Sequence, residues 1–182
     1  LPLPFAPIQI IVLELFMDLA ASATFVAEPE EAGTMKRPPV DPDEKFLNRS
    51  MKSTLVMGAI SLFAAVSTTF LITWYLNPNM AEVDRTLLAQ SVAFATWMLG
   101  HIFLALNFRS DREPLAKQGL LSNKLMLLWA LIVVVTLAVG TNLPFVNESL
   151  RITSLGLQEW ALVVGVAFAA TFWMELKKLL RL

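Results

Sequence analysis

Two carboxylates, Glu14 and Asp18, lie within a long apolar stretch of this 182-residue sequence. A spacing of four residues places both side chains on one face of a helix, about one turn apart. Ionised carboxylates this close repel each other, and a single charge inside a membrane is already costly. The pair therefore requires a bound cation, a shared proton or a cationic partner. We interpret it as part of an ion or proton pathway; the alternative is a structural pairing with a helix outside this sequence.

A single histidine, His101, is the only ionisable residue in another apolar stretch, residues 87–108. Its imidazole can ligate a cation or carry a proton, and it can equally be a neutral ring hydrogen-bonded to a backbone carbonyl or a hydroxyl. Because the chain has one histidine and no cysteine, it cannot form a multi-histidine or cysteine-ligated zinc site by itself. The candidate metal ligands are therefore Asp18, Glu14 and His101.

Long apolar segments must position these side chains, and the sequence has five, at residues 8–27, 53–76, 87–108, 125–146 and 157–174. A membrane-spanning helix needs about 20 mostly apolar residues, because each residue rises only about 1.5 Å across a hydrocarbon core of about 30 Å. Three of the five segments contain no Asp, Glu, Lys or Arg, which a helix with one face in water could hardly avoid. Each segment can therefore cross a membrane.

The composition agrees with this interpretation. Hydrophobic residues make up 56% of the chain and charged residues only 16%, against about 25% charged residues in soluble domains. That leaves too little polar sequence to cover five buried helices in water. We predict an all-α polytopic membrane protein in which residues 1–182 form a single transmembrane domain, a bundle of five helices, with the lipid bilayer as its partner.

The basic residues predict the orientation of the chain. Twelve of the fourteen Lys and Arg residues lie in segments 28–52 and 109–124 or after residue 174, and only Arg85 and Arg151 lie in the other loops. By the positive-inside rule, these basic segments and the C-terminus are cytoplasmic. The 14 basic residues nearly balance 15 acidic ones, so we expect no nucleic acid partner. We predict an integral, multi-pass protein of the plasma membrane.

Aromatic residues indicate where the helices meet the membrane surface. Most tryptophans and the one tyrosine fall close to predicted helix ends, where amphipathic rings favour the interface: Trp74, Tyr75, Trp129, Trp160 and Trp173. Trp97 lies away from the ends of its segment. We expect Trp97 to pack between helices instead.

The chain carries no motif for ATP chemistry. It contains no phosphate-binding loop, no dinucleotide fingerprint and no Ser-His-Asp order. It begins Leu1-Pro2-Leu3-Pro4, without an initiator methionine. We therefore expect a piece of a longer protein, with no catalytic residues and no ATP hydrolysis of its own.

Three short motifs resemble the C-terminal membrane part of P-type cation-transporting ATPases of the calcium-pump type. They are Leu1-Pro2-Leu3-Pro4 with Pro7-Ile8-Gln9-Ile10, then Glu14-Leu15-Phe16-Met17-Asp18, and Met35-Lys36-Arg37-Pro38-Pro39. The resemblance runs the whole length of the chain and implies that its five helices are the sixth to the tenth of such a pump. It also implies that ATP and Mg²⁺ bind only in domains that this chain lacks, and that the remaining helices and the cytoplasmic domains of the parent pump are its partners.

The resemblance implies a cation site as well. The family's sixth helix ligates ions through an Asn-x-x-Thr-Asp motif, whose positions fall here on Glu14, Met17 and Asp18, so that only the aspartate is retained. In the eighth helix of the calcium pump, a glutamate precedes the Asn of Ala-Leu-Asn by six residues, and His101 stands at that position before Asn107. Ca²⁺ prefers six to eight oxygen ligands, whereas imidazole suits transition metals or protons. Ca²⁺ is therefore one candidate for the transported cation.

The helix after the aspartate also differs from the family. The calcium pump has Gly and Pro there, which help to unwind the helix, whereas Leu19-Ala20-Ala21 here favours a continuous helix. From all these features we predict the C-terminal membrane part of an ATP-driven cation-translocating pump, which contributes ion ligands and the helix scaffold. The alternatives are a non-catalytic multi-pass scaffold or accessory subunit and part of a secondary transporter.

Overall fold

The computed structural model describes the chain except residues 32–33, 37–38, 40–48, 111–112 and 181–182, together with the side chains of Asp18 and Ser50. The described residues form helices and connecting segments, without a strand. Five helices are long and apolar enough to cross a membrane. The prediction of an all-α fold with five such helices is confirmed.

The first of these helices is composite, because α1 (Pro7–Leu13) continues into the π-helix η1 (Glu14–Ala20) and then into α2 (Ala21–Phe25). The other long helices are α3 (Arg49–Leu76), α4 (Glu82–Phe108), α6 (Lys124–Asn142) and α8 (Leu157–Leu179). Short helices lie in the connections: η2 (Thr34–Lys36), α5 (Leu115–Gln118) and α7 (Pro144–Leu150).

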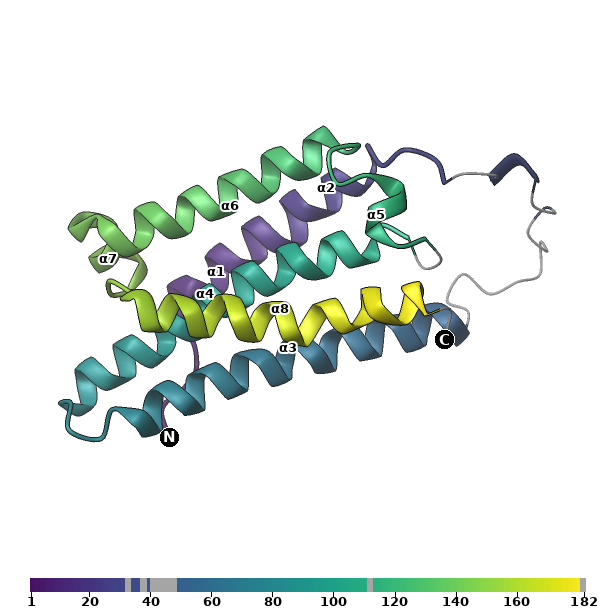
Figure 1. The fold of residues 1–182 in the computed structure, drawn as a ribbon. Helices are drawn as coiled ribbons and strands as arrows, with labels where there is room; N and C mark the ends of the chain where they lie inside the picture. Colours follow the sequence, from purple (N-terminus) through teal and green to yellow (C-terminus); the bar gives the residue numbers. More distant parts are fainter. Residues whose placement is uncertain (32–33, 37–38, 40–48, 111–112, 181–182) are drawn as a thin grey trace.

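Helix α6 ends at Asn142, four residues before the end of the predicted segment 125–146, because of Pro144. A residue that precedes proline is held away from helical angles, and Leu143 is extended with φ −97° and ψ 117°. Proline itself is well placed at the first position of a helix, so α7 begins at Pro144. The chain therefore turns at this end of the bundle before it enters α8 (Figure 1).

Helix α4 lies at the centre of the bundle, because 67% of its apolar stretch is buried, against 33% or less in the other four long helices. Side chains of α3 and α8 form one buried cluster with α4, which includes Val66 and Phe70. Side chains of the first helix, α6 and α8 form a second cluster with α4, which includes Leu13, Met17 and Trp129. The first helix and α6 thus share one side of α4, and α3 lies on the other (Figure 1).

Candidate cation site

The two carboxylates predicted to bind a cation belong to the π-helical segment η1 (Glu14–Ala20). The helix is continuous through Leu19-Ala20-Ala21, as expected, because it runs unbroken from Pro7 to Phe25. Its backbone, however, is π-helical up to Ala20 and returns to α geometry at Ala21. π-Helical turns are rare and occur frequently at functional sites. In this chain the helix is widened without the glycine and proline by which the family unwinds it.

The buried residues of the first helix explain why the wide turn fits. Gln9, Leu13, Met17 and Ala21 follow each other at intervals of four residues, and each is at most 8% exposed. An α-helix turns about 100° per residue, so four residues overshoot a full turn by about 40°. Over three such steps the buried row would wind out of the core. A π-helical turn holds more residues, which keeps the row facing α4 and α6.

Three hydrogen bonds join the first helix to residues that come later in the chain, one at each end of the helix and one in its middle. At one end, the buried Gln9 side chain donates from Nε2 to the carbonyl oxygen of Arg151, 2.8 Å away. In the middle, the indole Nε1–H of Trp129 on α6 donates to the carbonyl oxygen of Phe16 at 2.8 Å. At the other end, Asn123 donates from Nδ2 to the carbonyl oxygen of Thr24 at 2.9 Å. The first helix is thus held along its whole length from one side.

Trp129 lies near the start of α6, as predicted, but its ring packs inside the bundle. The sequence places it near a helix end at the membrane interface, but its side chain is packed in the bundle and the residue is only 4% exposed. Trp97 is half-buried and packs edge-on against Phe5, with ring centroids 5.4 Å apart. It contacts both buried clusters, as expected for a tryptophan between helices.

Glu14 is exposed in this chain, like its neighbours Ile11 and Leu15. The carboxylate therefore lies on the side of the first helix that the other described helices leave uncovered. Asp18 belongs to the same π-helical segment, but its side chain lies outside the described residues. A π-helical turn has more than four residues, so the four-residue spacing still places both positions on the same side.

His101 lies on α4, half-buried, with Nδ1 3.1 Å from the carbonyl oxygen of Trp97. A carbonyl oxygen only accepts hydrogen bonds, so Nδ1 carries a proton and is the donor in this contact. The ring also stacks on the Trp97 indole, with centroids 5.2 Å apart. Metal-ligating histidines usually hold their second nitrogen in this way, and so does a neutral structural histidine. Both roles predicted for His101 therefore remain open.

The described part of the chain contains no group of three or more His, Asp or Glu residues that could hold a metal ion. Asp18 is the ligand predicted with most support, and its side chain is outside that part. The set of Asp18, Glu14 and His101 therefore stays a prediction. The structure adds the π-helical backbone, which the sequence did not indicate.

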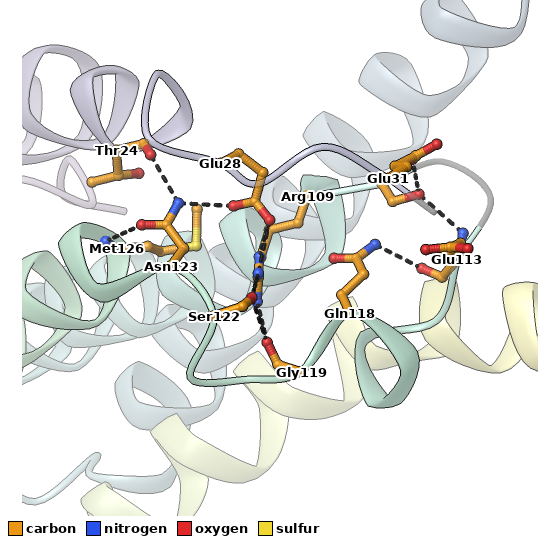
Figure 2. A network of polar contacts seen from close by, with 11 residues as sticks. Thr24, Glu28, Glu31, Arg109, Glu113, Gln118, Gly119, Ser122, Asn123 and Met126 are labelled. Carbon is orange, nitrogen blue, oxygen red and sulfur yellow. Dashed lines mark hydrogen bonds and ion pairs between the residues drawn. The ribbon is translucent and has the colours of Figure 1, made fainter. Parts of the chain in front are cut away.

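The end of the first helix is fixed by a buried ionic network (Figure 2). The Arg109 side chain, only 1% exposed, donates from Nε and Nη2 to Oε1 of Glu28, at 2.9 and 2.7 Å. Its Nη1 donates to the carbonyl oxygen of Gly119 at 3.1 Å, and its Nη2 also donates to the hydroxyl of Ser122. Asn123 donates from Nδ2 to the second oxygen of Glu28 at 2.8 Å. Each charge is paired, as a buried charge must be.

Sequence reasoning missed this network, because it considered Glu28 only as part of the charged segment 28–52. One signal was available: Asn123 directly precedes an apolar run, which is typical of a helix N-cap. Its Oδ1 accepts from the backbone N–H of Met126 at 2.9 Å. The pairing of Arg109 with Glu28 had no such local signal, because 81 residues separate them.

The fold and the site define a multi-pass helical membrane part with a distorted, carboxylate-bearing helix. Comparison with known families gives the same result, because the family described as "Cation transporting ATPase, C-terminus" matches residues 2–180. The chain therefore belongs to this family.

Several curated proteins are similar to the chain over nearly its whole length. A calcium-transporting ATPase of Listeria monocytogenes is 27% identical over 98% of this chain. One of Bacillus subtilis is 29% identical over 94%, and the plasma membrane-type calcium-transporting ATPase 5 of Oryza sativa is 26% identical over 91%. The chain spans 19% of the length of the two bacterial relatives and 15% of the rice protein.

Proposed function

We propose that this chain supplies the ion ligands and the supporting helices of an ATP-driven cation pump. The observation that carries the proposal is the π-helical segment Glu14–Ala20, which bears two carboxylates in the middle of a helix long enough to cross a membrane. Intramembrane carboxylates commonly mark ion pathways. The parent protein would bind ATP and Mg²⁺ in its other domains.

Asp18 is the first ligand of the proposed site, Glu14 the second and His101 the third. Asp18 and Glu14 lie in the same distorted turn, where two negative charges favour a bound cation. Glu14 is exposed within this chain, and a bare carboxylate facing lipid is costly. We therefore propose that further transmembrane helices of the parent pump cover this side and complete the site.

The proposed substrate is a metal cation, with Ca²⁺ tested first because several similar proteins are named calcium-transporting. A carboxylate pair provides the oxygen ligands that Ca²⁺ prefers. An imidazole instead favours a transition metal such as Mn²⁺, or a proton. The protein would act in the plasma membrane, with the basic loops and the C-terminus in the cytoplasm.

The test is phosphorylation of the full-length pump from ATP, measured against the concentration of Ca²⁺, Mn²⁺ or protons. The Asp18→Asn variant removes a charge and nearly keeps the shape. We expect its half-maximal ion concentration to rise by about tenfold or more. Mutation of a residue that only orients a metal ligand already lowers the affinity by about 10- to 100-fold. Thermal melting should stay close to wild type.

The matched control is Glu148→Gln, which removes the same charge from an exposed residue of α7. It should leave ion dependence unchanged. Wild-type ion dependence and melting in Asp18→Asn would contradict the site assignment. Loss of folding together with activity in that variant would instead indicate a structural carboxylate, as expected for a scaffold or accessory subunit.

A further inference from the structure

We propose that Trp129 is a positioning residue of the cation site, acting through the backbone carbonyl of Phe16. Phe16 lies between Glu14 and Asp18 in the π-helical segment. The indole of Trp129 reaches it from α6, with 2.8 Å between Nε1 and the carbonyl oxygen. The inference rests on the proposed function, because it assigns a role to a residue that touches the site only indirectly.

The contact is well placed to fix a backbone rather than to bind an ion. An indole N–H is a donor only, and a buried donor that loses its acceptor costs free energy. Trp129 is 4% exposed and packs in one cluster with Met126, 1% exposed, and Val133, fully buried. The ring is thus held in place by close packing, and its N–H points at one carbonyl.

The hydrogen bond from Trp129 to Phe16 favours one of two possible geometries of the segment Glu14–Ala20, π-helical or α-helical. A π-helical turn accommodates one residue more than the α-helical turn it replaces. Return of this segment to α geometry would rotate the residues on one side of the turn by about 100° relative to those on the other. Glu14 and Asp18 would remain about one turn apart, but their directions relative to each other and to α6 would change. A donor on Phe16 favours the register in which that carbonyl is accessible from α6.

The hydrogen bond to the π-helical segment comes from α6, a different helix that is also attached to one end of the first helix. Helix α6 is joined to one end of the first helix through Asn123, and the loop after α7 is joined to the other end through Gln9. These two bonds leave the middle of the helix unattached, and Trp129 fills that position. The element that carries the ligands and the element that holds them are therefore different helices.

The experiment compares two Trp129 variants in the full-length pump. Trp129→Phe removes the donor and part of the ring, and replacement by 3-benzothienylalanine removes only the N–H while keeping the shape. Because each change removes one neutral hydrogen bond, we expect the half-maximal ion concentration for phosphorylation to rise by about two- to tenfold. The maximal phosphorylation level should stay unchanged, because saturating ion selects the competent register.

The matched control is Trp173→Phe on α8, whose indole donates to the hydroxyl of Ser61 at 3.1 Å, away from the first helix. It should leave the ion affinity at the wild-type value. Hydrogen exchange of residues 14–20, measured in the same full-length proteins, should be faster in both Trp129 variants and unchanged in the control.

The outcomes separate this inference from the proposed function. Wild-type ion affinity in both Trp129 variants, beside an impaired Asp18→Asn pump, would overturn the role of Trp129 alone, even if hydrogen exchange were faster. Wild-type ion dependence in Asp18→Asn would overturn the cation site, and with it any site for Trp129 to position. A fall in the maximal phosphorylation level with unchanged affinity would also contradict positioning.

Discussion

The protonation of His101 is constrained by a single backbone contact. Nδ1 faces the carbonyl oxygen of Trp97 at 3.1 Å, so Nδ1–H donates there and a ligand role could fall only to Nε2. A ligand role requires Nε2 to be unprotonated. A proton and a metal cation would therefore compete for Nε2.

This relation gives a prediction for His101→Gln. If Nε2 is a ligand or proton carrier, as we propose, the half-maximal ion concentration of the full-length pump becomes less dependent on pH between about pH 6 and 7.5. The preference between Ca²⁺ and Mn²⁺ shifts towards Ca²⁺, because an amide oxygen replaces a nitrogen. The measurement is ion-stimulated phosphorylation across pH, with thermal melting beside it. An unchanged pH profile and ion preference would show that the imidazole is structural.

Arg109 and Glu28 show how a charged pair is tolerated inside this bundle. The guanidinium uses one nitrogen for a backbone carbonyl and the other two for the Glu28 carboxylate, while Asn123 satisfies the second carboxylate oxygen (Figure 2). Removing one member of a buried pair leaves the other uncompensated, which is commonly more costly than the pair is stabilising. The network fixes the end of the helix that carries the candidate ligands.

At the scale of elements, the first helix combines two helical geometries. The α-helical ends place Gln9 and Thr24 in the interior, each at most 1% exposed, and the π-helical middle keeps Met17 on the same buried row. An extra residue in a helix is absorbed locally by a π-helical turn. The helices on either side of it can then keep their contacts.

This geometry predicts an unusual tolerance of a deletion. Removing Leu19, exposed in η1, lets the segment return to α geometry while α1 and α2 stay in place. We expect the full-length protein to fold with near-wild-type melting but to lose about tenfold or more in ion affinity, since Asp18 changes its direction relative to Glu14 and to α6 when the π-helical turn is lost. Removing Leu131, which is also exposed, from the regular helix α6 is the control.

In the control, every residue beyond the deletion rotates by about 100°, which takes buried side chains such as Val133 out of the core. Expression and melting should therefore fall sharply for the Leu131 deletion only. Equal loss of folding in both deletions would show that the π-helical turn is not a local insertion. Equal ion affinity in the wild type and the Leu19 deletion would show that the π-helical turn is not needed for cation binding.

At the scale of the whole molecule, the bundle is asymmetric around α4. The first helix lies between α6 and α4 in the view of Figure 1 and is attached through α6 and the loop after α7. Glu14 on this helix is exposed within this chain. The ends of the bundle also differ in charge, because most of the Lys and Arg residues that the structure describes lie in the segments at the end that carries α5. That asymmetry sets the expected orientation in the membrane.

The orientation is testable with two exposed small residues at opposite ends, Ala116 in α5 and Ser149 in α7. Each is replaced by cysteine in the full-length pump, and this part of it contains no cysteine of its own. An impermeant thiol reagent applied to intact cells should label Ser149→Cys and not Ala116→Cys. After permeabilisation both should be labelled. The reverse pattern on intact cells would invert the topology.

The sequence by itself determined the class of the protein. Apolar length and the absence of charge are local properties, so the five membrane-length helices, the all-α fold and the family resemblance could be predicted before any contact was known. The carboxylates Glu14 and Asp18 stood out for the same reason, because charge is rare in such segments.

The tertiary structure alone decided how those residues are held. Large apolar residues lie on the exposed side of the first helix as well as on its buried side, so its buried row of four-residue intervals is not apparent in the sequence. The partners that fix it, Trp129 for Phe16 and Arg109 for Glu28, lie 113 and 81 residues away. Local propensity favours an α-helix through Leu19-Ala20-Ala21. Packing and hydrogen bonds from distant helices stabilise the π-helical turn instead, and such contacts exist only once the chain has folded.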